Sequence, residues 1–220
     1  MKQKKAHLLS ILQNQPVIPV LLIEQLQDAI PVTQALVRGG IKAVEVTLRT
    51  SVALDCIRAI SESVSEAIVG AGTVLDSKQF EAAERAGARF IVSPGLSTQL
   101  IEKAEFSAVP FLPGVITASE IMTACEKGYD ILKFFPAEQI GGIAYLQALA
   151  APFSETKFCP TGGISLLKAR KWLSLSNVIC VGGSWLAPKK LVQEQQWNAI
   201  TALAIEALQL SVIDTQRCCD

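Results

Sequence analysis

The sequence has little histidine, and His7 is the only one in 220 residues. Zinc sites in proteins are built mostly from histidine and cysteine, often with two cysteines in a Cys-x-x-Cys spacing. None of the six cysteines belongs to such a pair. We therefore expect no metal site.

An excess of charge of one sign is also lacking. Lysine and arginine together number 20, aspartate and glutamate also number 20, and no basic run occurs. Proteins that bind nucleic acid present clustered positive charge. We therefore expect no nucleic-acid partner.

Long hydrophobic stretches are missing as well. No apolar run reaches the 18 or more residues of a membrane-spanning helix, so no membrane partner is expected. Polar residues and a proline at 13–16 interrupt the apolar stretch near the N-terminus, and no signal peptide is expected. Four cysteines lie inside apolar segments and read as reduced thiols. These features favour a cytoplasmic protein.

What is present is the composition of a globular protein. Half of the residues are hydrophobic and 18% are charged, and the length is sufficient for one domain with a large core. No linker-like segment divides the chain, so residues 1–220 are predicted to form a single domain. Residues from about 211 to 220, with adjacent Cys218 and Cys219, read as a frayed tail to which we assign no role.

Apolar, β-branched runs recur along the whole chain. They are VIPVLLI (17–23), AVEVTL (43–48), AIVGAGTV (67–74), FIVSPG (90–95), PFLPGV (110–115), ILKFFPA (131–137), KFCPTGG (157–163) and VICVGGS (178–184). Their ends lie roughly 20 to 26 residues apart, the length of one strand, one helix and two short loops. The pattern predicts eight strands joined by helices.

Helical patterns fill the intervals between these runs. Clear examples are 77–88, 98–107 and 118–128, preceded by the N-capping residues Asp76, Ser97 and Thr117, and 191–210 reads as a closing helix. Eight strand–helix units predict an α/β fold of the (β/α)8 TIM-barrel type, here with a short N-terminal helix. The alternative is an open doubly wound sheet, which more often has five to seven strands.

Polar residues in the predicted strands share one parity. Glu45, Thr47 and Arg49 alternate with the apolar Val44, Val46 and Leu48. The apolar set belongs under the helices, so the polar set points inward or lies at the strand's mouth. Barrel active sites lie at the carboxyl ends of the strands, where Thr73 and Lys133 also fall. We expect Glu45, Arg49, Thr73 and Lys133 to converge on one cavity.

Lys133 is the most unusual of these residues, since it interrupts the apolar ILKFF. A lysine in an apolar, partly desolvated site can present a free amine that attacks a carbonyl to form an imine. Glu45 is a candidate general acid/base, and Arg49 with Thr73 a candidate carboxylate site. In the alternative interpretation, Lys133 is a snorkelling or ion-paired lysine and Glu45 merely neutralises a nearby cation.

Two glycine pairs follow the last two predicted strands, in PTGGIS (160–165) and VGGSW (181–185). Barrels often bind phosphate with these two loops, because backbone N–H groups of glycines can approach an anion closely. Gly162, Gly163, Gly183 and Ser184 are the candidates. Tight turns that require a positive φ are the alternative.

Together, several motifs resemble one known family. VEVTLRT (44–50), VGAGTVL (69–75), SPG (93–95), KFFPAE (133–138), PTGG (160–163) and GGSW (182–185) resemble the 2-keto-3-deoxy-6-phosphogluconate (KDPG) aldolases, also called 4-hydroxy-2-oxoglutarate (KHG) aldolases. The resemblance covers residues from about 10 to 210.

The resemblance implies a role for each matching residue. Lys133 matches the Schiff-base lysine and Glu45 the general acid/base, while Arg49 and Thr73 match the residues that bind the substrate carboxylate. Pro94 and Phe135 match apolar walls of the pocket. The side near the C4 hydroxyl and phosphate is matched by Thr161, Gly162, Gly163 and Ser184.

The resemblance also implies an activity and a setting. The expected reaction is cleavage of 2-dehydro-3-deoxy-6-phospho-D-gluconate to pyruvate and D-glyceraldehyde 3-phosphate, without a metal or other cofactor. Cleavage of 4-hydroxy-2-oxoglutarate to pyruvate and glyoxylate is expected as well. Members are typically cytoplasmic homotrimers of the Entner–Doudoroff pathway. An aldolase for the galactonate epimer and a non-catalytic barrel that binds sugar phosphates are the alternatives.

Overall fold

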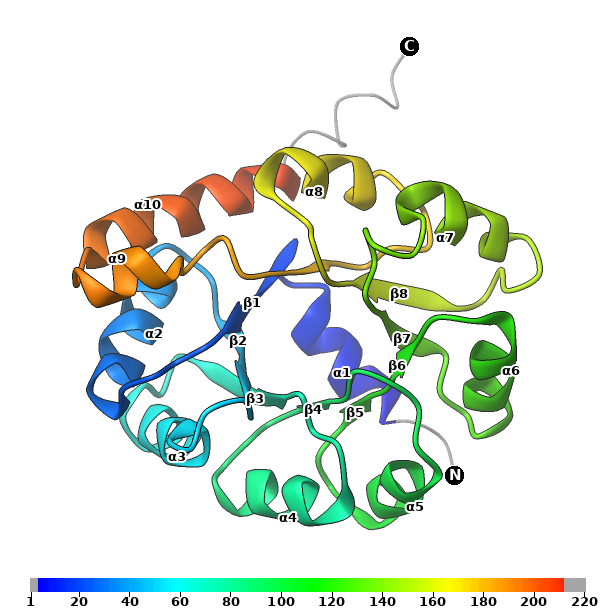
Figure 1. Cartoon of the computed structure of the whole chain (residues 1–220), viewed down its shortest axis with the longest axis horizontal. Coiled ribbons are helices and arrows are strands. Elements are labelled where there is room, and N and C mark those ends of the chain that lie inside the picture. Colours follow the sequence, from blue (N-terminus) through cyan, green and yellow to red (C-terminus); the bar gives the residue numbers. More distant parts are fainter. Residues whose placement is uncertain (1–3, 212–220) are drawn as a thin grey trace.

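The computed structural model describes residues 4–211, in which strands and helices alternate, and every helix but the first lies outside the ring of strands (Figure 1). The strands are β1 (Val17–Leu21), β2 (Ala43–Thr47), β3 (Ile68–Gly72), β4 (Ile91–Val92), β5 (Phe111–Leu112), β6 (Gly114–Val115), β7 (Ile131–Phe134), β8 (Lys157–Pro160) and β9 (Val181–Gly183). The helices are α1 (Lys5–Leu12), α2 (Ala29–Arg38), α3 (Ala53–Ser63), α4 (Ser77–Arg85), α5 (Thr98–Phe106), α6 (Ala118–Glu126), α7 (Gly142–Ala150), α8 (Leu166–Leu173), α9 (Lys189–Gln193) and α10 (Trp197–Leu208), with short 3-10 turns η1 (Leu26–Asp28) and η2 (Gln209–Ser211).

Each of the eight predicted runs contains a strand, and the short N-terminal helix is present as α1. The three predicted helices between strands are confirmed as α4, α5 and α6. The predicted tail falls on residues 212–220 after Ser211, and Cys218 and Cys219 also lie outside the described range. None of the helices within residues 4–211 is long and apolar enough to cross a membrane.

The strands pair in parallel and follow the chain in order. One sheet has the order β5-β4-β3-β2-β1-β9, and a second sheet has the order β6-β7-β8. The first strand therefore lies beside the last one, and the strands surround a common centre (Figure 1). An open doubly wound sheet reverses its strand order near the middle, so that alternative does not fit.

The curled parallel arrangement meets the barrel prediction in part, because the pairing divides into two sheets. The fifth predicted run is split at Pro113: residues 111–112 pair with β4, whereas residues 114–115 pair with β7. The carbonyl of Pro113 still accepts a hydrogen bond from Lys133 N–H at 2.9 Å.

The second break in the ladder also lies at a proline. Phe158 N–H donates to the Asn177 carbonyl at 2.8 Å, and Ile179 N–H donates to the Phe158 carbonyl at 3.0 Å. The next rung of a parallel ladder would need an N–H from residue 160, and Pro160 has none. Thr161 and Gly182 then form an isolated bridge beyond the break.

Two apolar clusters hold the fold together. The larger one lies between strands and helices and contains Val44 and Val46, the predicted outward face of β2. The smaller one contains Ala43 and other inward-facing strand residues, together with Leu8, Ile11 and Leu12 of α1. Helix α1 crosses the middle of the ring in Figure 1. It thus covers the amino ends of the strands and leaves the carboxyl ends for a cavity.

Helix ends follow the predictions with two differences. Asp76 accepts a hydrogen bond from Gln79 N–H at 2.8 Å, and Thr117 forms a capping box with Glu120. Ser97 occupies the N-cap of α5 but makes no side-chain capping bond. The single closing helix predicted at 191–210 is wrong, because the chain turns at Gln195 with a φ of 52° and separates α9 from α10.

Candidate active site

A cavity of about 280 Å³ opens at the carboxyl ends of the strands. Its lining brings together ten of the residues singled out in the sequence, from strands and loops far apart in the chain. They are Glu45, Arg49, Thr73, Pro94, Lys133, Phe135, Thr161, Gly162, Gly163 and Ser184. The expected convergence of Glu45, Arg49, Thr73 and Lys133 is confirmed.

Lys133 and Glu45 face each other across the centre of the ring. Lys133 Nζ lies 3.4 Å from Glu45 Oε1, and the two side chains are only 6% and 5% exposed. Lys133 Nζ also lies 5.4 Å from the centre of the Phe135 ring. This geometry gives an amine held among apolar groups with one carboxylate within reach for proton transfer. The pairing fits both the catalytic interpretation and a neutralising role for Glu45, which are compatible.

The carboxylate of Glu45 lies directly over Gly72 on the neighbouring strand. A Cβ built on Gly72 would lie 1.9 Å from Glu45 Oε1 and 2.6 Å from Glu45 Cγ. Strand β3 therefore leaves room for the Glu45 side chain to reach Lys133 only because it carries no side chain at this position.

The cavity rim beside β2 and β3 carries a cation and hydroxyl groups. Arg49 Nε donates a hydrogen bond to Thr47 Oγ1 at 3.2 Å, and Thr47 Oγ1 donates to the Leu21 carbonyl at 2.9 Å. Thr73 has a φ of 60°, an unusual conformation for a β-branched residue and one that is common at functional sites. A guanidinium beside a hydroxyl is suited to bind a carboxylate.

The glycine turn after β8 fits both interpretations of its sequence, a tight turn that requires a positive φ and a site where backbone N–H groups bind an anion. Gly162 and Gly163 have φ angles of 106° and 73°, so the turn does require glycine. Among residues 4–211, none accepts a hydrogen bond from the backbone N–H groups of Gly162, Gly163 or Ile164. Three successive free N–H groups at a cavity wall can bind an anion.

The second glycine pair is used differently from what the sequence indicated. Gly182 lines the cavity, whereas Gly183 does not. A Cβ on Gly183 would lie 1.8 Å from the Trp185 ring, so close packing of that ring explains this glycine. A Cβ on Gly182 would lie 2.2 Å from Thr161 Oγ1, so Gly182 makes space for a cavity hydroxyl.

Four lining residues were not among the predicted site residues: Val20, Thr47, Ile164 and Gly182. Thr47 could have been found, because it shares the inward parity of Glu45 in AVEVTL. Val20 and Ile164 are ordinary apolar residues, and no local signal distinguishes them from core residues.

Comparison with known proteins identifies the family. Residues 8–203 match the sequence model of the aldolase family described as KDPG and KHG aldolase. The chain belongs to the KDPG and KHG aldolase family. The resemblance found in the sequence motifs is thus confirmed.

Similar members of this family come from several bacteria. The KHG/KDPG aldolase of Escherichia coli (strain K12) is 48% identical over 209 residues, which cover 95% of this chain and 98% of that protein. The 2-dehydro-3-deoxy-phosphogluconate aldolase of Dickeya dadantii is 47% identical over 208 residues, which cover 94% of this chain and 98% of that protein.

The solved structures agree with this assignment. A KDPG aldolase from Legionella pneumophila, with pyruvate captured as a covalent carbinolamine intermediate, matches with a TM-score of 0.89 and 42% identity, covering 91% of this chain and 97% of that one. The aldolase of Zymomonas mobilis ZM4 with 3-phosphoglycerate matches with a TM-score of 0.86 and 45% identity, covering 91% and 94%.

Proposed function

We propose that this protein is a class I aldolase that cleaves 2-dehydro-3-deoxy-6-phospho-D-gluconate to pyruvate and D-glyceraldehyde 3-phosphate. The observation that carries the proposal is the buried Lys133–Glu45 pair, at 3.4 Å, in the cavity that Arg49 and Thr73 also line. Membership of the KDPG and KHG aldolase family supports it. No metal or other cofactor takes part in the proposed reaction.

In the proposed mechanism, Lys133 Nζ attacks the C2 carbonyl carbon of the substrate and forms a carbinolamine. Glu45 supplies the proton that lets water leave, which gives the protonated imine. The imine then accepts the electron pair of the C3–C4 bond as Glu45 takes the proton of the C4 hydroxyl group. The aldehyde departs, and the remaining enamine is protonated at C3 and hydrolysed to pyruvate and free Lys133.

The other cavity residues have proposed binding roles. Arg49 and Thr73 hold the substrate carboxylate, and Pro94 and Phe135 form apolar walls next to the pyruvate unit. The opposite end of the cavity receives the C4 hydroxyl group and the phosphate. There Thr161, Gly162, Gly163 and Ser184 are the proposed contacts, with free backbone N–H groups in the glycine turn.

Cleavage of 4-hydroxy-2-oxoglutarate to pyruvate and glyoxylate is proposed as a second activity, because that substrate needs only the pyruvate end of the cavity. A solved structure of a 4-hydroxy-2-oxoglutarate aldolase/2-deydro-3-deoxyphosphogluconate aldolase from TTHB1 is 38% identical with a TM-score of 0.83. The galactonate epimer is less favoured: the structure described as native KDPGal is 30% identical.

Four finer features are also part of the proposal. The two sheets act as one closed (β/α)8 barrel, supported by the bridges that join β8 to the segment around β9. The protein works as a homotrimer, as members of the family typically do. It is cytoplasmic and serves the Entner–Doudoroff pathway, where its substrate is formed.

The function is tested by comparing kcat/KM for the gluconate substrate, its galactonate epimer and 4-hydroxy-2-oxoglutarate. We expect the gluconate substrate to give the highest value. A higher value for the epimer would reassign the substrate, and binding of all three without turnover would favour the non-catalytic barrel.

Lys133→Ala is expected to abolish turnover of every substrate while the protein stays folded, because among the described residues that line the cavity no other has an amine that can form the imine. Thermal unfolding checks the fold, and a coupled assay for pyruvate checks turnover. Activity that survives in the folded variant would rule out the mechanism.

A further inference from the structure

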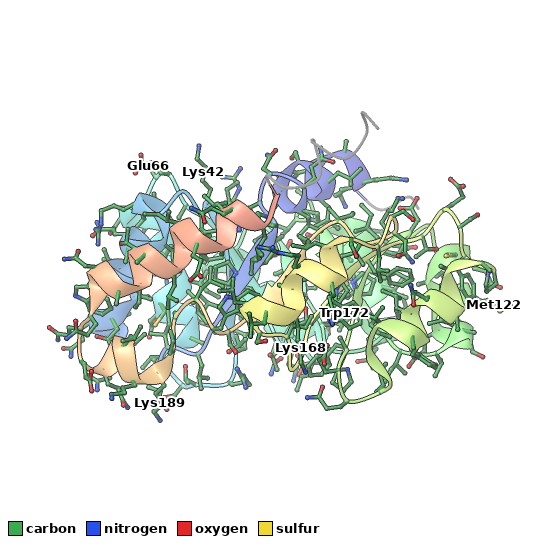
Figure 2. All side chains as sticks on the ribbon, turned by 90° about the horizontal axis from the view of Figure 1, so that it is seen from above. Lys42, Glu66, Met122, Lys168, Trp172 and Lys189 are labelled. Atoms are coloured by element: carbon green, nitrogen blue, oxygen red, sulfur yellow. The ribbon has the colours of Figure 1, made fainter. Side chains whose placement is uncertain are left out.

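Glu138 lies in the segment after β7, the strand that carries Lys133, and its side chain contacts helix α8, which follows the glycine turn. Its Oε2 accepts a hydrogen bond from Lys168 Nζ at 2.5 Å, and its Oε1 accepts one from Trp172 Nε1 at 2.7 Å. Lys168 and Trp172 lie one turn apart on α8, where Figure 2 labels both. One carboxylate therefore holds α8, through residues near its start and its end, against the segment after β7.

The backbone of the same segment holds the glycine turn from its other side. Ala137 N–H donates to the Thr161 carbonyl at 2.8 Å, and Glu138 N–H donates to the Gly162 carbonyl at 3.1 Å. With these two carbonyls engaged, the turn is fixed on the face opposite to its free N–H groups.

The turn also packs directly on Glu138. A Cβ on Gly163 would lie 2.9 Å from Glu138 Cβ and 2.9 Å from Gln139 Nε2. A displacement of Glu138 would therefore change the space into which Gly163 fits, and with it the direction of the neighbouring N–H groups.

The electrostatics of Glu138 show that its carboxylate is the favoured form. Partial burial acts to raise the pKa of Glu138, but the hydrogen bonds from Lys168 and Trp172 outweigh it, so the pKa lies below its ordinary value. Trp172 is fully buried, and its indole N–H would lose this partner if the carboxylate were removed.

We propose that Glu138 is a positioning residue for the phosphate end of the substrate: through Lys168 and Trp172 it fixes the turn at Thr161–Gly163 so that the free N–H groups face the cavity. This inference rests on the proposed function, and in particular on the phosphate lying at that turn. It assigns no role to Glu138 at the pyruvate end, since Lys133 is held separately by its own strand pairing in β7.

The inference predicts a difference between two substrates of the same enzyme. Glu138→Ala should raise KM for the phosphorylated gluconate substrate by about tenfold or more, whereas KM for unphosphorylated 4-hydroxy-2-oxoglutarate should change by less than about threefold. Borohydride trapping of pyruvate on Lys133 should be unchanged. Inorganic phosphate should inhibit the variant more weakly than the wild type.

One further variant separates the charge of Glu138 from its packing, and another serves as a control. Glu138→Gln keeps the size of the side chain and an acceptor for the Trp172 indole, so it should fold and give a smaller effect of the same kind. Asp130→Asn is the matched control, because Asp130 also bonds a lysine, Lys5, at 2.5 Å, but just before β7 at the opposite end of that strand. The control should leave both KM values unchanged.

A different role for Lys168 would give the opposite sign. If Lys168 itself bound the phosphate, Glu138→Gln would release the lysine, and KM for the phosphorylated substrate would stay the same or fall. That result, or an equal rise for both substrates, would overturn the inference. Failure of the proposed function is a separate outcome, recognised when the wild-type protein neither cleaves these substrates nor traps pyruvate.

Discussion

At the residue scale, the site contains charged side chains within otherwise apolar strands, and these residues could be predicted. Lys133 stands out in ILKFF, and Glu45 stands out by its parity in AVEVTL. Thr47 does not stand out, because threonine is an ordinary strand residue. The importance of Gly72 depends on the register that places Thr47 opposite it, and no single strand contains that information.

Glu45→Gln should lower kcat by more than about tenfold, since the amide cannot exchange protons with the carbinolamine or the C4 hydroxyl group. The substitution preserves the size of the side chain over Gly72, so the fold should be kept. Steady-state kinetics measure the effect, with Glu66→Gln on the surface as control. A decrease below tenfold would exclude a main acid/base role for Glu45.

Thr47→Val should raise KM several-fold for both substrates, phosphorylated or not, because it removes the hydrogen bond that orients Arg49 at the carboxylate end. It also removes the donor to the Leu21 carbonyl. Thr47→Ser keeps both bonds and should restore most of the affinity. If the serine variant is as impaired as the valine variant, or if the valine variant is not impaired, the hydroxyl group of Thr47 does not have this role.

At the scale of elements, the alternation of strands and helices could be predicted, whereas the breaks could not. The strand split at Pro113 depends on which neighbour each half of the run meets. The turn at Gln195, with φ at 52°, occurs at a residue that seldom marks a helix end. In both places the tertiary contacts decide where the element ends, and a local sequence pattern does not show which segment lies next to it.

The N-caps of α4 and α5 offer a matched test of helix energetics. Asp76→Ala should lower the free energy of unfolding by about 1 kcal/mol, because it removes the bond to Gln79 N–H. Ser97→Ala should have almost no effect, since Ser97 makes no capping bond. Urea unfolding of both variants measures the difference. An equal loss in the two variants would contradict this account of the caps.

At the scale of the whole molecule, the arrangement brings together residues that are far apart in sequence. Glu45 lies on β2 and Lys133 on β7, yet their side chains meet because both point to the centre of the ring. The repeat of strand and helix is enough to predict that geometry. The division of the pairing into two sheets was not predictable, because it arises where Pro160 meets a particular neighbouring segment.

The central claim, imine formation at Lys133, is tested most directly by trapping with pyruvate and sodium borohydride. We expect a gain of roughly 72 Da on the peptide that contains Lys133, the mass of a reduced pyruvate imine, and no gain when pyruvate is omitted. The Lys133→Ala variant should gain nothing. No adduct on active, folded protein, or an adduct only on another lysine, would contradict the account.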